Sequence, residues 1–128
     1  MNVQEGLIYV AYAYQHYATY SNSYLNFHVH TNQIFTALEA CKVCLLKKDQ
    51  NHKGVVYQVE TGEGKSCIIQ LIAAVLAICG KTVHITSSNI NRANRDYFES
   101  YSFFQTIGLE TAVLLHYYEL PYINFQNL

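Results

Sequence analysis

The hydrophobic residues near the start of the chain recur at helical spacing. Within residues 1–23, the positions that form one face are Leu7, Ala11, Tyr14 and Ala18. Side chains three or four positions apart lie on the same side of an α-helix, so the pattern predicts a helix that packs on the rest of the protein. Gln15 and His16 interrupt the apolar run and no basic segment precedes it, so we expect neither a signal peptide nor a membrane span.

A second apolar period predicts a helix from Thr31, whose hydroxyl can cap it, to about residue 46. The positions that carry this period are Ile34, Leu38, Cys41 and Leu45. Cys41 and Cys44 form a Cys-x-x-Cys pair, but no second close pair of Cys or His stands at the spacing of a zinc site. We therefore expect two thiols that face the core of a protein residing inside the cell.

From residue 55 onward, short apolar runs alternate with helical patterns. The expected strands are residues 55–60, 81–86 and 111–115, and the expected helices are residues 67–79 and 92–106, followed by Gly80 and Gly108. Strands that alternate with helices predict an α/β fold, with a parallel sheet, right-handed crossovers and helices on its faces. Residues 47–54 are polar and predict an exposed loop, whereas residues 116–128 show no clear period.

The composition narrows the class of protein further. The chain has 128 residues, 51% of them hydrophobic, which is enough material for one modest core and indicates a single domain. The net charge is -1 with only eight Lys and Arg residues, and this argues against a chain built mainly to coat nucleic acid.

The most informative stretch is VVYQVETGEGKS, residues 55–66, where a short apolar run meets a glycine-bracketed turn that ends in Lys-Ser. Polyphosphate binding needs backbone N–H donors that no side chain covers, and Gly62 and Gly64 provide such a turn while allowing positive φ. Lys65 can reach the β and γ phosphates as a point charge, and the Ser66 hydroxyl can bind Mg²⁺. The alternative is a strand-to-helix turn that binds nothing.

Residues 59–115 resemble the first nucleotide-binding domain of SecA, the motor ATPase of protein translocation. The matching motifs are TGEGKS at residues 61–66, Gly80-Lys81, Arg95-Asp96, and Phe104 with Gly108-Leu109. The resemblance implies a partial domain of the RecA-like, P-loop NTPase type. Residues 1–54 would form its N-terminal helices and Gln-motif region, residues 55–115 its core, and residues 116–128 an unassigned tail.

The resemblance also implies that the chain binds ATP and Mg²⁺. The residues it assigns to the nucleotide are Gln33, Thr61, Gly62, Glu63, Gly64, Lys65 and Ser66, and it assigns Ser66 to the metal as well. In SecA-like and other superfamily 2 motors, a Gln before the glycine turn reads the adenine edge, and Gln33 is the matching residue here. A side-chain amide offers a donor and an acceptor together, which suits adenine.

The function implied by the resemblance is a motor that couples ATP binding and hydrolysis to polypeptide movement. Its partners would be an unfolded polypeptide and a membrane translocation channel, and its location the cytoplasm or the membrane periphery. The sequence departs from the family in having Ser66 in place of Thr. Separately, Val59 stands where the general phosphate-loop pattern has Gly. It has neither the Asp-Glu box nor the arginine fingers, so we assign no catalytic residue and expect the chain alone to bind nucleotide weakly without turnover.

Two other classes remain open. A nucleic-acid helicase of the same superfamily would share the glycine turn, with Arg92 and Arg95 placed to contact strand phosphates, although Arg95 could equally form an ion pair within the fold. A noncatalytic module would retain the turn as scaffold only. Stimulation of ATPase activity by RNA would favour the helicase, and stimulation by unfolded polypeptide would favour the translocase.

Overall fold

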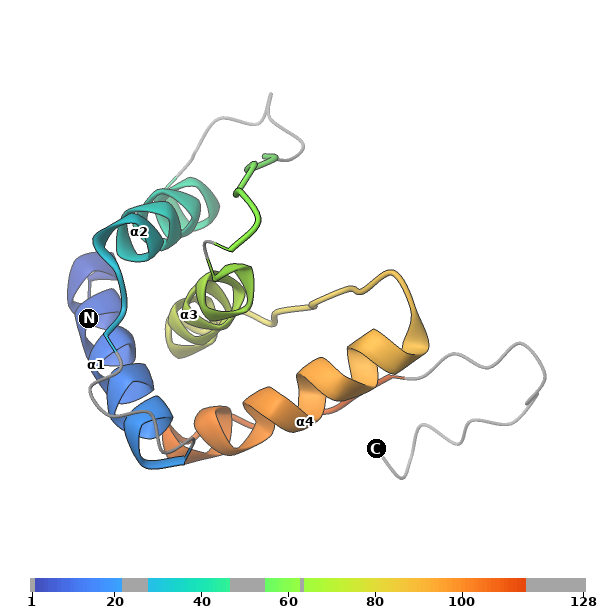
Figure 1. Ribbon diagram of the computed structural model, residues 1–128. Coiled ribbons are helices and arrows are strands. Elements are labelled where there is room, and N and C mark those ends of the chain that lie inside the picture. The colour runs from blue at the N-terminus through green and yellow to red at the C-terminus, as the bar shows by residue number, and fades with distance from the viewer. Residues whose placement is uncertain (1, 22–27, 47–54, 63, 115–128) are drawn as a thin grey trace. The chain divides into compact units, whose positions relative to one another are not determined.

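The computed structural model describes residues 2–21, 28–46, 55–62 and 64–114 (Figure 1). Its helices are α1 (Val3–Ser21), α2 (Thr31–Leu46), α3 (Lys65–Ile78) and α4 (Ile90–Thr106). The chain divides into two compact units, Met1–His84, which contains α1 to α3, and Ile85–Leu128, which contains α4. The expected loop at residues 47–54 and the tail at residues 116–128 lie outside the described residues.

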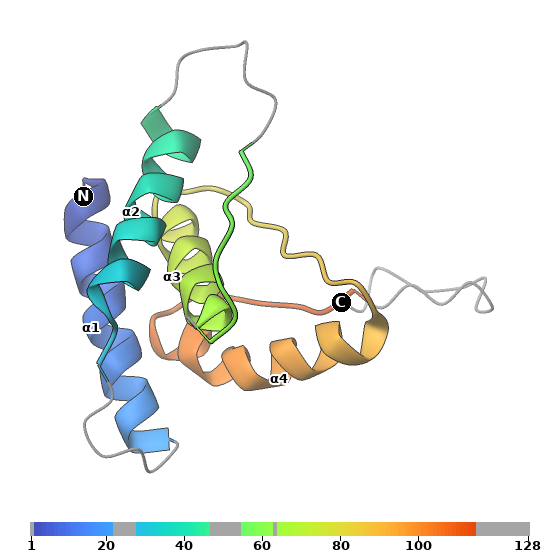
Figure 2. The same cartoon turned by 45° about the horizontal axis from the view of Figure 1, so that its top comes forward.

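Helices α1, α2 and α3 form the packed part of the first unit, and each of them contacts the other two (Figure 2). The core residues they contribute include Leu7, Val10, Ala37, Cys41, Leu71, Ala74 and Val75. Several of these side chains are small, and small side chains at a contact allow helix axes to approach closely. Each fully buried Leu or Val contributes roughly 1.5–3 kcal/mol relative to an exposed position, so this cluster stabilises the unit.

The helical face predicted for α1 is confirmed at Leu7, Ala11 and Ala18, which are buried, whereas the fourth predicted residue, Tyr14, is half-buried. The face predicted for α2 is only partly correct. Its fully buried residues are Gln33, Ala37, Ala40 and Cys41, whereas the expected Ile34, Leu38 and Leu45 are half-buried. The expectation of two core-facing thiols is wrong for Cys44, which is exposed, and right for Cys41.

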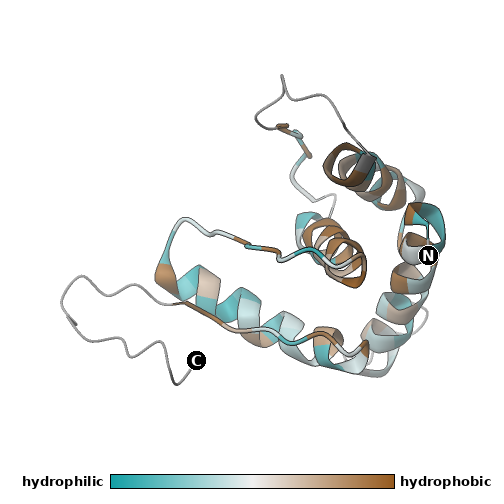
Figure 3. Ribbon diagram, turned by 180° about the vertical axis from the view of Figure 1, so that it is seen from behind, coloured by the Kyte–Doolittle hydropathy of each residue, from teal (hydrophilic) through white to brown (hydrophobic). Residues whose placement is uncertain are grey.

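Helix α3 is the most apolar of the four helices, and Figure 3 shows it almost entirely in brown. It ends where the sequence predicts, because Gly80 follows with φ 87 and the Lys81 N–H donates to the carbonyl of Leu76 at 3.0 Å. A positive φ after the last turn lets the chain turn back and bond the free carbonyls. None of the described helices is long and apolar enough to cross a bilayer.

Helix α4 is the regular element among the described residues of the second unit, and it starts two residues before the predicted residue 92. Asn89 caps it, since its Oδ1 accepts from the Arg92 N–H at 2.8 Å. The buried residues of this helix are Ser100, Phe103 and Phe104. Gly108 follows with φ 81, as expected for the glycine that ends a helix.

The predicted α/β fold with a RecA-like parallel sheet is wrong for this structure. The regular structure of the described residues is helical, and residues 55–60, 81–87 and 109–114 form no strand. Their apolar side chains are largely exposed, as for Val56 at 96%, Ile85 at 54% and Leu114 at 62%. A strand is defined by hydrogen bonds to a neighbouring strand, and an apolar β-branched run indicates a preference without providing that neighbour.

Candidate functional site

The glycine turn, defined here as residues 61–64, leads directly into α3. Gly62 has φ 91 and Gly64 has φ 73, so both glycines adopt the left-handed conformation that residues with side chains rarely take. The predicted positive φ is confirmed at both positions. Glu63, which was also assigned to the nucleotide, lies outside the described residues.

The two glycines differ in what surrounds them. A Cβ added to Gly62 would meet no heavy atom within 4 Å, so the space beside this residue is open. A Cβ added to Gly64 would overlap the side-chain nitrogen of Gln33. Both positions favour glycine through their backbone conformation, and a side chain at position 64 would in addition displace the end of the Gln33 side chain.

Lys65 and Ser66 open α3 and are both exposed, as is Thr61 on the other side of the turn. The first amides of an α-helix have no intrahelical acceptor, and the helix dipole adds partial positive charge at that end. The N-cap residue of α3 is Gly64, which has no side chain to cap the helix. The open space beside Gly62, the first-turn amides and the Lys65 ammonium together suit an anionic group such as a phosphate.

Gln33 lies at this turn although it is 31 residues away in sequence. Its side chain is 5% exposed, and both ends of its amide are bonded to the backbone. The oxygen accepts from the His30 N–H at 2.9 Å, and the nitrogen donates to the Gly64 carbonyl at 3.5 Å. Because α2 begins at Thr31, that residue is the first residue of the helix and not its cap. Gln33, at the third position of the helix, accepts from the N–H of the preceding His30, as the Gln of a capping box does.

A second glutamine, Gln15 of α1, holds the segment before α2 by a side-chain hydrogen bond. The Oε1 atom of Gln15 accepts from the Val29 N–H at 2.7 Å, which fixes the segment immediately before α2. The hydrophobic pattern does not predict this role, because a single Gln in an apolar helix only interrupts the pattern. A polar residue between buried positions of a helix is the signal that could have indicated it, since buried amides need partners.

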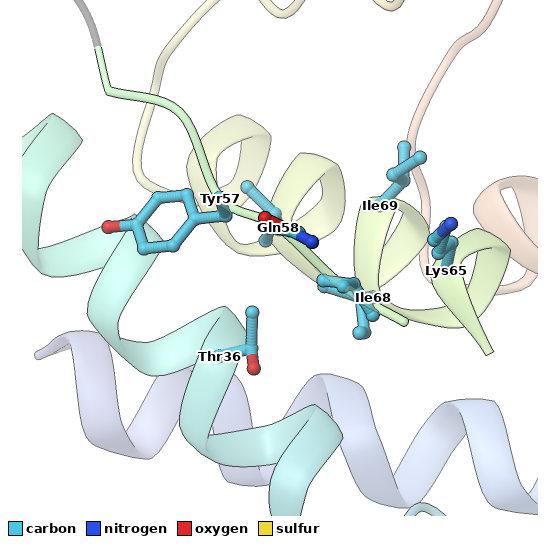
Figure 4. A pocket seen from close by; sticks show the side chains of 8 residues that line it. Thr36, Tyr57, Gln58, Lys65, Ile68 and Ile69 are labelled. Carbon is cyan, nitrogen blue, oxygen red and sulfur yellow. The ribbon is translucent and has the colours of Figure 1, made fainter. Parts of the chain in front are cut away.

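An apolar cavity of about 550 Å³ lies beside the glycine turn (Figure 4). Its lining residues are Thr36, Tyr57, Gln58, Val59, Lys65, Ile68, Ile69 and Ile72. Figure 4 shows that Thr36 comes from α2 and that Lys65 comes from the start of α3. Tyr57 and Gln58 come from the non-helical segment before the glycine turn, residues 55–60. The volume lies within the range of small-molecule sites, and Lys65 supplies its charged group. Sequence pattern alone does not predict this cavity, because its lining residues come from separate segments.

Two buried thiols of this unit are chemically inert at neutral pH. Burial raises the pKa of Cys67 to about 11, and a hydrogen bond with Tyr14 partly opposes burial by lowering the pKa. Burial also raises the pKa of Cys41 to about 12, with smaller contributions from Cys44 and Cys79. A thiol at a helix N-terminus is ordinarily acidified, but for Cys67 the loss of water outweighs that effect. Both residues act as packing groups.

In the second unit, Arg95 forms ion pairs within its own helix. Its guanidinium lies 3.0 Å from the carboxylate of Asp96 and 3.9 Å from that of Glu99. The side chains involved are 45–61% exposed, so the pairs contribute at most about 1 kcal/mol. Of the two alternatives for Arg95, phosphate contact and an ion pair within the fold, this arrangement corresponds to the ion pair.

Comparisons with known proteins place most of the chain in one family. The family profile described as "SecA DEAD-like domain" matches residues 7–121. The protein translocase subunit SecA of Clostridium acetobutylicum is 37% identical over 65 residues, and that of Clostridium botulinum is 38% identical over the same length. SecA of Desulfovibrio desulfuricans is 35% identical over 65 residues. Each match covers 51% of this chain and 8% of the relative. No solved structure matches significantly.

Proposed function

The chain belongs to the SecA DEAD-like domain family, and we propose that it binds ATP with Mg²⁺ as a nucleotide-binding part of a SecA-like protein translocase. The single observation that carries this proposal is the glycine turn at the start of α3. Gly62 and Gly64 have positive φ there, and Lys65 and Ser66 are exposed beside the first-turn amides. A triphosphate carries several negative charges, and this arrangement opposes them with backbone donors and one ammonium group.

Each residue of the proposed site has a separate task. The backbone amides at the start of α3 would bind phosphate oxygens, Lys65 would neutralise their charge, and Ser66 would bind the metal. Mg²⁺, when bound, shields the phosphate charges and fixes their orientation. Thr61 precedes Gly62 in the sequence, and Glu63 lies between the two glycines. The adenine-reading role of Gln33 stays a prediction, and it is tested by comparing nucleotides that carry different bases.

Coupling of ATP to polypeptide movement is proposed for the protein as part of a larger machine. The matched region covers 8% of its SecA relatives, and those relatives are named as translocase subunits. Phosphoryl transfer needs a positioned water and cationic charge on the transition state in addition to a phosphate cradle. We therefore propose nucleotide binding for this chain. We further propose that turnover, an unfolded polypeptide substrate and a membrane channel depend on additional domains.

Titration with labelled Mg·ATP tests the proposal. The wild-type chain should show saturable binding, and Lys65→Ala should weaken it about tenfold or more, because a hydrogen bond to a charged group contributes roughly 1.5–3 kcal/mol. Lys81→Ala is the matched control, since Lys81 is also exposed but follows α3 at its other end. Absence of saturable binding by a folded sample, or equal loss in both variants, would contradict the proposal and favour a noncatalytic module.

A further inference from the structure

The side-chain amide of Gln33 contacts the backbone of two separate segments. It accepts from the His30 N–H and donates to the Gly64 carbonyl. The same Gly64 carbonyl accepts from the Ile68 N–H at 3.3 Å, which is the first hydrogen bond of α3. A carbonyl oxygen has two lone pairs and can accept both bonds. Gln33 therefore meets the glycine turn at the atom where α3 begins.

We propose that Gln33 is a positioning residue, which orients the phosphate-binding amides through the Gly64 carbonyl and so sets the affinity for the polyphosphate part of a nucleotide, whatever its base. This inference rests on the proposed nucleotide binding. It differs from the adenine-reading role because it predicts equal effects on nucleotides with different bases and on inorganic polyphosphate.

Because the peptide group is planar, Gln33 can set the direction of the Lys65 N–H through the Gly64 carbonyl. The carbonyl of Gly64 and the N–H of Lys65 belong to one peptide group, and in a trans peptide they point in opposite directions. The structure contains no cis peptide among its described residues. A side chain that holds the carbonyl on one side therefore directs the Lys65 N–H to the other side. The amide that Gln33 orients is thus the first one offered by α3 to an anion.

Burial makes the position of Gln33 well defined. An amide that is 5% exposed loses its water contacts, and leaving a buried polar group unpaired costs about 1–3 kcal/mol. Its oxygen is held at His30, in a segment that Gln15 of α1 ties through the Val29 N–H. The nitrogen then reaches Gly64 closely enough that any Cβ there would overlap it. A side chain at position 64 would therefore displace this end of Gln33.

The first experiment measures the Kd of Mg·ATP, Mg·GTP and tripolyphosphate for the wild type and for Gln33→Met, which keeps the length of the side chain and removes its amide. We expect Gln33→Met to weaken all three about equally, by roughly fivefold or more, because one hydrogen bond at the turn is lost. The ratio of ATP to GTP affinity should stay within about twofold of the wild-type value. Gln105→Met, at an exposed position of α4, is the control and should change none of the three.

The results distinguish the positioning role of Gln33 from the adenine-reading role. Loss of ATP binding with unchanged tripolyphosphate binding would overturn the positioning role and favour reading of the base. Absence of binding by the wild-type chain would contradict the proposed function itself. In that case the contact between Gln33 and Gly64 is still tested by a measurement that needs no ligand.

That measurement is a pair of double-mutant cycles on Tm. Gly64→Ala should lower Tm less in a Gln33→Ala background than in the wild type, because the shortened side chain removes the overlap. Gly62→Ala shares the strained positive φ but meets no neighbouring atom, so its effect should add to that of Gln33→Ala. Additive effects in both cycles would show that Gln33 does not hold the turn and would overturn the inference.

Discussion

Helices α3 and α4 end in the same way and begin in opposite ways. Gly80 and Gly108 follow them with φ 87 and φ 81, so both helices close on a glycine in the left-handed conformation. At the other end, Asn89 caps α4 with its own side chain, which accepts from the Arg92 N–H at 2.8 Å. Helix α3 has Gly64 at its N-cap position instead, with φ 73 and no side chain to cap the helix.

The difference indicates where each helix obtains its stability. A side-chain cap contributes about 1 kcal/mol and occupies the amides that a ligand would need. Helix α3 omits that cap and buries more apolar surface, at Cys67, Ile68, Leu71, Ala73, Ala74 and Val75. Figure 3 shows the same contrast, with α3 mostly hydrophobic and α4 largely hydrophilic. An uncapped N-terminus is compatible with a stable helix when burial replaces the cap.

The largest expected effect comes from removing that burial. Leu71 is fully buried in α3, and Leu71→Ala should lower the free energy of unfolding of the first unit by about 2–5 kcal/mol through lost transfer energy and a cavity. Chemical denaturation followed by circular dichroism measures the change. Ile69→Ala on the same helix is the control, since Ile69 is 45% exposed and should cost much less. Similar losses in the two variants would refute the view that burial holds α3 in place.

The sequence predicted the helices well because their signals are local. The apolar period locates α1, and the glycines at positions 80 and 108 locate the ends of α3 and α4. The sheet was predicted wrongly because an extended apolar run does not specify a pairing partner. Val56 and Ile85 belong to such runs, and both are exposed.

The candidate site was predictable only in part. The positive φ of Gly62 and Gly64 follows from the motif, because few other residues adopt that conformation. The contact between Gln33 and Gly64 does not follow from local pattern, since it joins positions 31 residues apart. The buried face of α2 was misplaced for a related reason. A polar Gln at position 33 was not counted as a core residue, although a bonded amide can be buried.

The second-largest expected effect is a pH dependence of the free energy of unfolding that arises in α3 and not in α4. Cys67 lies in the first turn of α3, and α4 contains no cysteine. The pKa of the Cys67 thiol rises from 9.0 to about 11 on burial, so the unfolded chain releases this proton first. The stabilising contribution is therefore complete below pH 9 and is lost as the pH rises through about 11. The free energy of unfolding should fall by up to about 1.4 kcal/mol per pH unit in this interval.

Urea denaturation at pH 8 and pH 10.5 measures this slope. Cys67→Ala should lose part of the decrease between the two pH values, because the group that titrates is gone. Cys44→Ala serves as the control, since Cys44 is an exposed thiol of the same unit. An unchanged slope in Cys67→Ala would mean that another group causes the alkaline loss of stability.

The smallest effect tests the caps themselves. Asn89→Ala removes the acceptor of the Arg92 N–H and should cost about 1 kcal/mol, whereas Asn89→Asp keeps an oxygen at that position and should cost much less. Hydrogen exchange followed by NMR can assign the loss to the first-turn amides of α4. Addition of Mg·ATP should protect first-turn amides of α3 instead, because the N-cap residue Gly64 has no side chain to occupy them. Protection of α4 rather than α3 would reverse the assignment of the binding end and remove the contrast between the two helices.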